Sequence, residues 1–324
     1  TKTSYFTGET FSSAGMVVTA TMADGSKKTV TGYTCSPTTM AANTTAVTVS
    51  YSEGGVTKTT TTPVTVTSIS NTLASNSWAT IRAVSDAGKG SNYWSVGDAK
   101  GITINGKVGA TTISNLAISV FILGFNHNAS REGNNRIHFQ IGKINGTLVG
   151  LVDGNYGSST STTGAFTMNT SNTNSGGWNN SHMRKTVLGA DSSPSNPTAN
   201  TLLAALPADL RAVMKSVTKY TDNTGNASNT AAAVTATTDY LWLLAEFEIQ
   251  GARSYANQYE QNSQAQYDYF KAGNSKIAYK YNDVSTAVWS RGRSANYNNN
   301  NNFCITNTDG SANNNNANNS GAVL

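Results

Sequence analysis

Few residues in this sequence have the types and spacing that catalysis requires. Glu246 and Glu248 are two positions apart and would share one face of a strand. A glycosidase instead needs its two carboxyl groups on opposing walls, about 5 Å or more apart. A carboxylate among apolar neighbours must be paired if it is buried, so we expect Glu246 to pair with Arg184, Arg253 or Arg291. The acidic pair therefore predicts a structural role.

The histidines and cysteines do not form a recognisable metal or nucleophile motif. His127, His138 and His182 lack HExxH or other short ligand spacing, and the chain has no P-loop, GxSxG or GxGxxG. Cys304 alternates with apolar residues in "FCIT", which is typical of a packed strand, and Cys35 lies far from it. We therefore expect two free thiols, no metal, no cofactor and no catalysis.

The most unusual feature is a cluster of asparagines near the end of the chain. The 29 residues from Asn296 to Leu324 contain 13 of them. The interruptions are orderly, because "FCIT" alternates like a strand, Asp309-Gly310 marks a turn and "SGAVL" is apolar again. An asparagine tract can be a disordered tail or an aggregation segment, and these interruptions argue against both.

The genetic code accounts for such a cluster in a third way. Asparagine is encoded by AAC and AAT, and if only adenines are randomised, these codons become any NNY codon and never a stop codon. A cluster of asparagines on a loop-bearing scaffold is then what an undiversified template would encode. We expect these side chains to be exposed on one face, with Tyr297 and Phe303 as the large contacts. The predicted ligand-binding positions are Asn296, Tyr297, Asn298, Asn299, Asn300, Asn301, Asn302, Asn313, Asn314, Asn315, Asn316, Asn318 and Asn319.

The elements that must position this cluster fall into two predicted domains. Residues 1–68 contain short alternating stretches separated by Asp24-Gly25 and Gly54-Gly55 turns, which predicts a small antiparallel β-sandwich. "MADGSKKTVTGYT" and "VTVSYSEGGVTKTTTTPVTV" resemble bacterial immunoglobulin-like domains, which implies a spacer or a contact with a glycan or receptor. We expect a linker at 69–77.

The second predicted domain, 78–324, reads as α+β. "SWATIRAVS" and the apolar residues 116–125 look like strands, as does "TTDYLWLLAEFEI". "SHMRKTVLG", "NTLLAALPADLRAVMKSVTKY" and "SYANQYEQNSQAQYDYFKAG" carry helical signals. We therefore expect helices around a twisted antiparallel sheet.

Several stretches of this domain resemble a known fold. "GGWNNSHMRKTVLG", "AVWSRGRSANYNNNNNFCITNTDGS" and "SGAVL" are similar to C-type-lectin-like domains of the formylglycine-generating-enzyme branch. With the asparagine cluster, the chain resembles variable proteins of diversity-generating retroelements, which implies a hypervariable region at 295–320. The enzymes of the branch use a cysteine pair, and this domain has Cys304 alone. The resemblance implies these scaffold residues: Trp289, Arg291, Phe303, Cys304, Ile305 and Glu246.

Composition sets the expected partners and place. Only 12% of residues are charged and the net charge of +5 is scattered, so nucleic-acid binding is not expected. The longest apolar run is about half the roughly 20 residues of a membrane helix, so no membrane insertion is expected. We expect a binder of a protein or glycan receptor, on a phage tail or a bacterial surface, with a homo-oligomer left open. The alternatives are a carbohydrate-binding module, with Trp94, Trp178, Tyr255 and Tyr259 as stacking residues, or a fibre spacer.

Overall fold

The computed structural model describes residues 1–324, and the chain divides into two compact units. The N-terminal unit is Thr1–Asn71 and the C-terminal unit is Thr72–Leu324. Their boundary falls inside the stretch 69–77, which the sequence predicts to be a linker. That stretch is not simply extended, because it contains a short 3-10 helix, η1 (Leu73–Ser75), with Leu73 buried.

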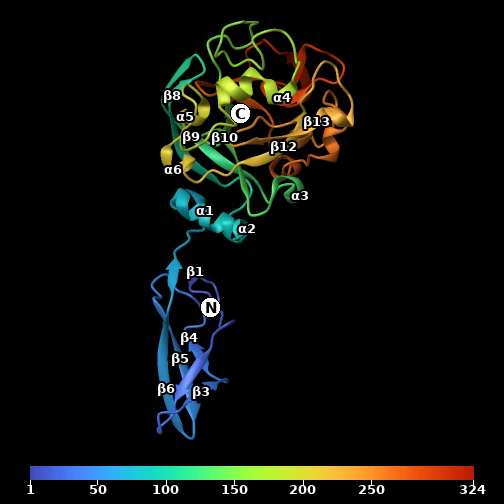
Figure 1. Ribbon diagram of the computed structural model, residues 1–324. Helices are drawn as coiled ribbons and strands as arrows, with labels where there is room; N and C mark the ends of the chain where they lie inside the picture. Colours follow the sequence, from blue (N-terminus) through green and yellow to red (C-terminus); the bar gives the residue numbers. More distant parts are fainter. The chain divides into compact units, whose positions relative to one another are not determined.

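The N-terminal unit consists of short strands around a small core (Figure 1). Tyr5, Met40, Val47 and Val64 form that core. Two pairings are antiparallel hairpins, as the DG and GG turns predict, but β1 and β7 pair in parallel, so the unit is not wholly antiparallel. Its strands are β1 (Ser4–Phe6), β2 (Val18–Thr21), β3 (Lys27–Val30), β4 (Thr34–Ser36), β5 (Ala46–Glu53), β6 (Val56–Pro63) and β7 (Thr65–Thr67).

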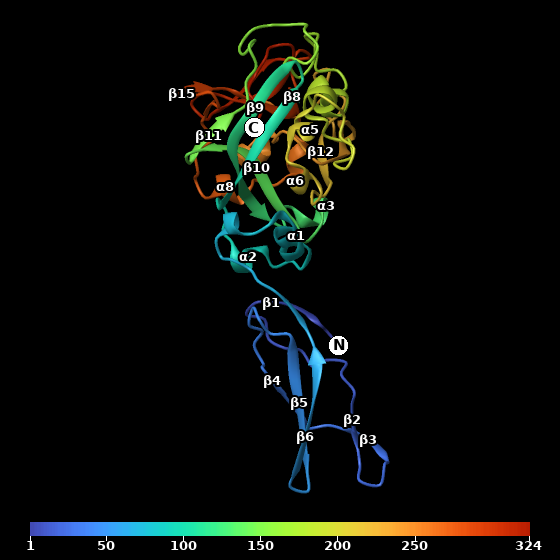
Figure 2. The same cartoon turned by 90° about the vertical axis from the view of Figure 1, so that its left-hand side faces the viewer.

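The C-terminal unit is α+β, in agreement with the coarse class predicted from the sequence. Its main sheet has six strands in the order β15-β14-β11-β10-β9-β8, and Figure 2 shows β8, β9 and β10 side by side. All neighbours in this sheet are antiparallel except β11 and β14. The strands are β8 (Ala99–Val108), β9 (Thr111–Phe125), β10 (Ile137–Ile144), β11 (Thr147–Gly150), β14 (Ala278–Lys280) and β15 (Asp283–Val288).

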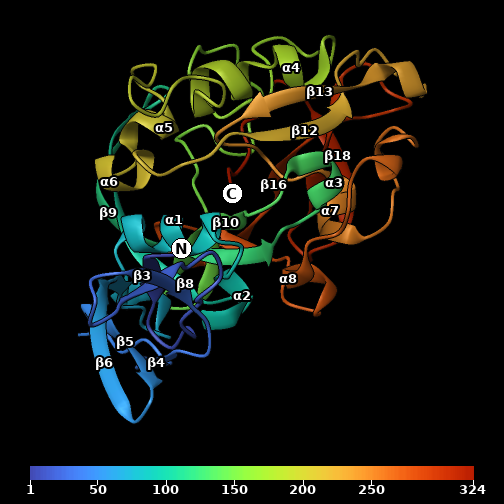
Figure 3. The same cartoon turned by 60° about the horizontal axis from the view of Figure 1, so that its bottom comes forward.

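Two smaller sheets and several short helices complete the unit. The strands β12 (Val217–Asp222) and β13 (Val234–Asp239) form a hairpin, visible in Figure 3, and β16 (Ser290–Ala295), β17 (Asn302–Thr306) and β18 (Ala312–Asn316) form a three-stranded sheet. The helices are α1 (Trp78–Asp86), α2 (Gly90–Tyr93), α3 (Ala129–Glu132), α4 (Gly177–Asn180), η2 (Met183–Leu188), α5 (Leu202–Ala205), α6 (Ala208–Arg211), η3 (Ala231–Ala233), α7 (Glu246–Gln250), η4 (Glu260–Asn262) and α8 (Asp268–Lys271). No helix is long and apolar enough to cross a membrane.

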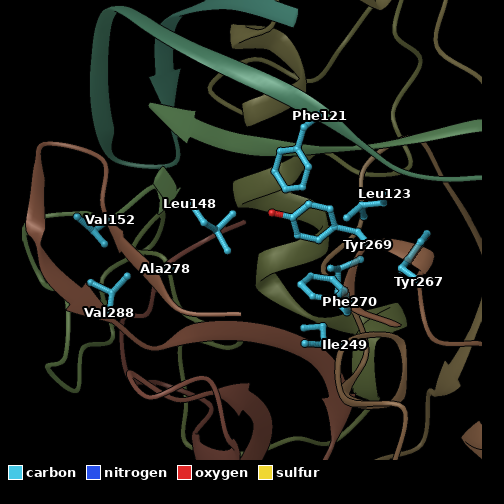
Figure 4. Packing of buried hydrophobic residues seen from close by; sticks show 12 residues of the cluster. Phe121, Leu123, Leu148, Val152, Ile249, Tyr267, Tyr269, Phe270, Ala278 and Val288 are labelled. Carbon is cyan, nitrogen blue, oxygen red and sulfur yellow. The ribbon is translucent and has the colours of Figure 1, made fainter. Parts of the chain in front are cut away.

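A cluster of aromatic and aliphatic side chains packs beneath the main sheet (Figure 4). The rings of Phe121 and Tyr269 lie with their centroids 4.8 Å apart, and Tyr269 meets Phe270 edge to face at 5.3 Å. The same core includes Leu148 on β11 and Val288 on β15. Burial of such side chains supplies the main favourable free energy of folding.

One segment predicted as a strand is a helix, and a second begins in strand β13 but ends in a helix. Residues 78–86 form α1, because Trp78, Ile81 and Val84 recur every three residues on a buried face and Ser77 caps the first turn, accepting a hydrogen bond from Thr80 N at 3.0 Å. The end of "TTDYLWLLAEFEI" forms α7, which stops at Gly251 with a φ of 70°. Glu246 and Glu248 therefore do not share a strand face.

Two segments predicted as helices are mostly something else. In the stretch 200–220 Pro207 separates α5 from α6, and the last residues belong to β12. In the stretch 254–273 only η4 and α8 are helical. There the side chains of Asn257 and Gln264 bond to groups of other elements, Asp222 and the Tyr220 carbonyl. The predicted α+β class agrees with the structure, but the helix and strand assignments of these stretches were wrong in whole or in part.

Candidate functional site

The asparagine cluster lies on the small sheet β16-β17-β18 and its loops. Strand β17 is central, and Phe303, Cys304 and Ile305 on it are all buried. Strand β18 pairs only with β17, so it is an edge strand whose four asparagines are partly exposed. The sheet thus buries its apolar strand and presents its asparagine strand at an edge.

Most of the predicted positions reach the surface to some degree. Asn298, Asn299 and Asn300 are exposed. The others that are partly exposed are Asn301, Asn302, Asn313, Asn314, Asn315, Asn316, Asn318 and Asn319. We call these eleven residues the asparagine surface.

Two predicted contact positions are buried instead. Asn296 is only 2% exposed, and its side-chain oxygen accepts a hydrogen bond from Asn298 N at 2.9 Å, which turns the chain into the loop. Phe303 is fully buried in β17 and is therefore a framework residue, not a ligand contact. Tyr297 is partly exposed, and its ring lies 4.8 Å from the guanidinium of Arg253. Tyr297 and Arg253 are thus the large side chains beside the asparagine surface.

Asn174 holds the backbone of the loop that carries part of the asparagine surface. Its side-chain nitrogen lies 2.7 Å from the carbonyl oxygen of Asn299, 2.9 Å from that of Asn302 and 3.4 Å from that of Asn296. Its backbone N–H donates to Asn300 O at 2.8 Å. Asn174 is fully buried and lies outside the asparagine cluster. The loop is therefore shaped by bonds to its main chain.

Arg291 holds the backbone at the C-terminal end of the asparagine cluster, near Asn316 and Asn319. This side chain is 2% exposed and donates to the carbonyl oxygen of Asn316 at 2.8 Å and also to that of Asn319. Its guanidinium lies 4.7 Å from the centre of the Trp289 ring, and burial lowers its pKa to about 9. A Cβ on Gly321 would overlap that ring, so only glycine allows this packing.

Further main-chain bonds tie residues 317–320 to the segment 157–169. Asn169 N donates to Ala317 O at 3.0 Å, and Thr160 N donates to Asn318 O at 3.0 Å. Among the asparagine side chains themselves, Asn302 bonds Asn314, and Asn319 bonds Asn315 at 3.0 Å. The backbone is therefore held by framework groups, while the asparagine side chains bond mainly one another or adjacent residues. Asn319 is an exception, because its side-chain oxygen accepts from Ser159 Oγ at 2.6 Å.

Glu246 supports the neighbouring loop, but without an arginine partner. Its carboxylate accepts hydrogen bonds from the backbone N–H groups of Ser254, Tyr255 and Ala256, at 2.7 to 3.1 Å. The predicted ion pair with Arg184, Arg253 or Arg291 is therefore wrong. Hydrogen bonds from backbone N–H groups to a carboxylate are charge-assisted, so they can satisfy a buried carboxylate without a cation. Because Tyr297 N bonds Tyr255 O at 2.9 Å, Glu246 also braces the start of the asparagine loop.

A buried cluster of charges lies behind this sheet. Lys219 is fully buried on β12, and its ammonium lies 2.8 Å from Glu132 and 2.9 Å from Glu248. Arg293 on β16 also pairs with Glu248, with one nitrogen–oxygen distance of 2.9 Å. The hydroxyl of Tyr267 accepts from Lys219 at 2.9 Å. The cluster links β12, α3, α7 and β16, and so fixes the small sheet relative to the rest of the unit.

The two carboxylates of this cluster have opposite pKa shifts. Burial raises the pKa of Glu132 to about 7, against the attraction of Lys219. Burial alone would also raise the pKa of Glu248, but the charges of Arg293 and Lys219 outweigh it and hold that pKa below its usual range. Glu248 is thus the permanent anion of the cluster.

His127, Glu132 and Glu248 offer ligand atoms within 4.8 Å of one another, a spacing that could hold a metal ion. The Lys219 ammonium already contacts both carboxylates and supplies the cation there. These residues therefore fit a structural ion cluster better than a metal site. The sequence prediction missed the cluster because its members are scattered. The one signal in the sequence was Lys219 itself, which lies between the inward-facing Val217 and Thr221 of β12.

Arg184 and the two tryptophans considered for sugar stacking have structural roles. Trp178 is fully buried and donates to Asp239 at 2.9 Å, and Arg184 also pairs with Asp239 at 2.8 Å. Trp94 is 3% exposed. Neither tryptophan can stack on a bound sugar. Tyr255 and Tyr259 are partly exposed.

The comparisons with known proteins give one result. A family model described as "Domain of unknown function (DUF6273)" matches residues 160–323. The match begins before Asn174 and runs through the asparagine surface to Val323, so the framework and the surface it holds lie in one family domain. No curated protein and no solved structure matches the chain. Since the match spans half of the sequence, the chain belongs to the DUF6273 family.

Proposed function

We propose that the C-terminal unit is a ligand-display domain whose asparagine surface is diversified by adenine-specific mutagenesis. The observation that carries this proposal is the way the backbone of the cluster is held. Asn174 and Arg291 bond to main-chain carbonyls of Asn296, Asn299, Asn302, Asn316 and Asn319, not to their side chains. Side chains can then change while the backbone stays in place.

This arrangement serves binding in the way that antibody loops do. Exposed asparagines offer hydrogen-bond donors and acceptors but little apolar area, so the present surface binds weakly. Substitution by Tyr, Phe, Ser, Asp or Gly, all encoded by NNY codons, supplies new contacts. Tyr297 and Arg253 lie beside the asparagine surface as fixed anchors. Under this proposal the unit has a C-type-lectin-like fold, and the N-terminal unit is an immunoglobulin-like spacer.

The proposed partner is a protein or glycan receptor on a target cell, and the proposed place is a phage tail or a bacterial surface. The polar composition, with only 12% charged residues, supports an exposed structure of this kind.

The nucleotide sequence around the gene tests the mechanism. We expect a nearby second copy of the segment that encodes residues 295–320, differing only at adenines, beside a reverse transcriptase gene. A second copy with substitutions at other bases would contradict adenine-specific mutagenesis.

A display library tests the scaffold. The eleven codons of the asparagine surface are changed to NNY in the full chain, and the library is selected against a panel of purified proteins. We expect folded binders with different specificities, because the backbone of these positions is held through its main-chain groups. Substitutions at the exposed positions Asn298, Asn299 and Asn300 should each change stability by less than about 0.5 kcal/mol. The matched control randomises exposed positions of β6, among them Thr57, Thr59 and Thr61, which lie on a strand in the N-terminal unit. General unfolding of the first library, or equal yields of binders from both, would argue against the proposal.

A further inference from the structure

A cavity of about 180 Å³ lies in the C-terminal unit, away from the asparagine surface. It follows one edge of β10. This strand pairs with β9 along most of its length but with β11 only at Lys143 and Ile144, so the edge from Ile137 to Ile141 has no neighbouring strand. The opposite walls come from α1, from residues 202–217 and from residues 240–244.

The lining is apolar apart from a few groups. Trp78, Ile81, Leu206, Val213 and Leu244 are among the residues that line it, and no acidic side chain does. Three cationic residues line it: Arg82 and Lys215 share the single carboxylate of Asp86, and the Nε of Arg136 donates to the carbonyl oxygen of Glu132. An apolar cavity of about 150 Å³ is large enough for a benzene ring.

Two polar side chains in the lining have atoms that lack hydrogen-bond partners. His138 is 2% exposed and Gln140 is 4% exposed, and both line the cavity. His138 Nε2 and both amide atoms of Gln140 have no hydrogen-bond partner. The two residues are two positions apart in β10, so they point to the same face of the strand. Unpaired buried polar groups cost free energy, and their proximity here points to a ligand that would pair them.

The neighbours of His138 bear on which of its two ring nitrogens carries the proton. Lys219 can only donate, so the Tyr267 hydroxyl accepts from it at 2.9 Å. The same hydroxyl lies 2.8 Å from His138 Nδ1 and can donate its proton to that nitrogen. Burial also lowers the pKa of His138 well below its ordinary value, which keeps the ring neutral. When Nδ1 accepts the Tyr267 proton, the neutral His138 ring carries its own proton on the unpaired Nε2, which can then donate to a ligand.

We propose that this cavity binds a small, uncharged, mainly apolar molecule, about the size of a substituted benzene ring, whose carbonyl or hydroxyl oxygen accepts hydrogen bonds from His138 Nε2–H and the Gln140 amide. Water alone is a poor occupant. At roughly 30 Å³ per water the space would take about six molecules, each needing two to four polar partners, and the lining side chains are mostly apolar.

Three probes of similar shape test the proposal on the full chain by isothermal titration calorimetry: acetophenone, ethylbenzene and benzoate. We expect acetophenone to bind about tenfold more tightly than ethylbenzene, the value of roughly one good hydrogen bond, and benzoate to bind weakest because its charge must be desolvated. In Gln140→Leu the preference for acetophenone over ethylbenzene should fall or reverse. This variant should fold, because the amide it removes has no partner.

A variant that fills the cavity tests whether the probes bind there. Val213→Trp should abolish binding of all three probes, whereas Val284→Trp, at an exposed position on β15, should leave it unchanged. The proposal is overturned if no probe binds the unmodified chain, if binding survives Val213→Trp in a protein that is still folded, or if a crystal soaked with acetophenone holds only water in the cavity. Equal affinity of acetophenone for the unmodified chain and Gln140→Leu would remove Gln140 from the site.

Discussion

At the scale of single residues, the side chains that matter most here bond to backbone groups or to one another, not to solvent. Asn174, Arg291 and Glu246 each satisfy several main-chain groups of the asparagine region. Lys219 and Glu248 hold a charge cluster together in the core. Such groups are costly to bury and become stabilising only when every partner is present. Predictions at this scale therefore concern the removal of one partner.

Glu248→Gln should destabilise the C-terminal unit by about 3–5 kcal/mol, because Lys219 and Arg293 would lose the carboxylate they share. Urea unfolding measures this loss. The control is Asp86→Asn, at a side chain that is 47% exposed and paired with Arg82 and Lys215, where we expect less than about 1 kcal/mol. Equal losses in the two variants would show that the buried cluster is not a stabilising unit.

His127 should make stability depend on pH. Burial lowers its pKa from 6.5 to about 4, so the folded state favours the neutral ring. Its contribution is fully present above pH 6.5 and is lost as the pH falls toward 4, by roughly 3 kcal/mol. His127→Phe keeps the stacking on Tyr267, whose ring centroid is 3.6 Å away, and removes the titration. We expect the variant to gain stability relative to the unmodified chain between pH 7.5 and 4.5, and a constant difference would exclude His127.

At the scale of elements, the asparagine surface depends on a buried strand, an edge strand and a loop tied to a distant segment. The wrong assignments were also made at this scale. Residues 78–86 contain both apolar periods over a short length, and the Ser77 cap was the signal for a helix. The three-residue spacing of Trp78 and Ile81 outweighed alternation because that face packs against β10, where Phe139 meets Trp78 edge to face.

Asn174→Leu should loosen the loop 296–302. The substitution removes the donor to the carbonyls of Asn299 and Asn302, so we expect a loss of about 2 kcal/mol and faster hydrogen exchange across the loop. Asn300→Ser is the control, because the exposed Asn300 side chain makes no hydrogen bond within the protein. Exchange that is as slow in Asn174→Leu as in the control would show that the asparagine side chains, and not the framework, order the loop.

At the scale of the whole molecule, the two units have separate cores. Tyr5 and Met40 belong to one, and Phe121 and Tyr269 belong to the other. We expect calorimetry to resolve two transitions, and a protein made of residues 72–324 alone should keep the upper one unchanged. One cooperative transition, or a lower melting temperature of the shorter protein, would show that the units stabilise each other.

The sequence by itself determined the features that depend on neighbouring residues. Local alternation, apolar runs and turn residues account for the hairpins of the N-terminal unit, the long strand β9, the buried strand of Phe303 to Ile305 and the α+β class. The asparagine cluster was equally visible, because it is a matter of composition.

Only the tertiary structure decided which polar side chains are buried and what they bind. Glu246 looked like an ion-pair partner and instead accepts backbone amides, Asn296 looked exposed and is buried, and Lys219 meets Glu132 and Glu248 from elements far apart in the chain. The residues next to a polar side chain do not show which group it will bind. Lys219 is 87 positions from Glu132 and 29 from Glu248, and these partners meet only when the sheets pack. The free energy of burying a charge is set by those distant groups, so no local pattern can predict it.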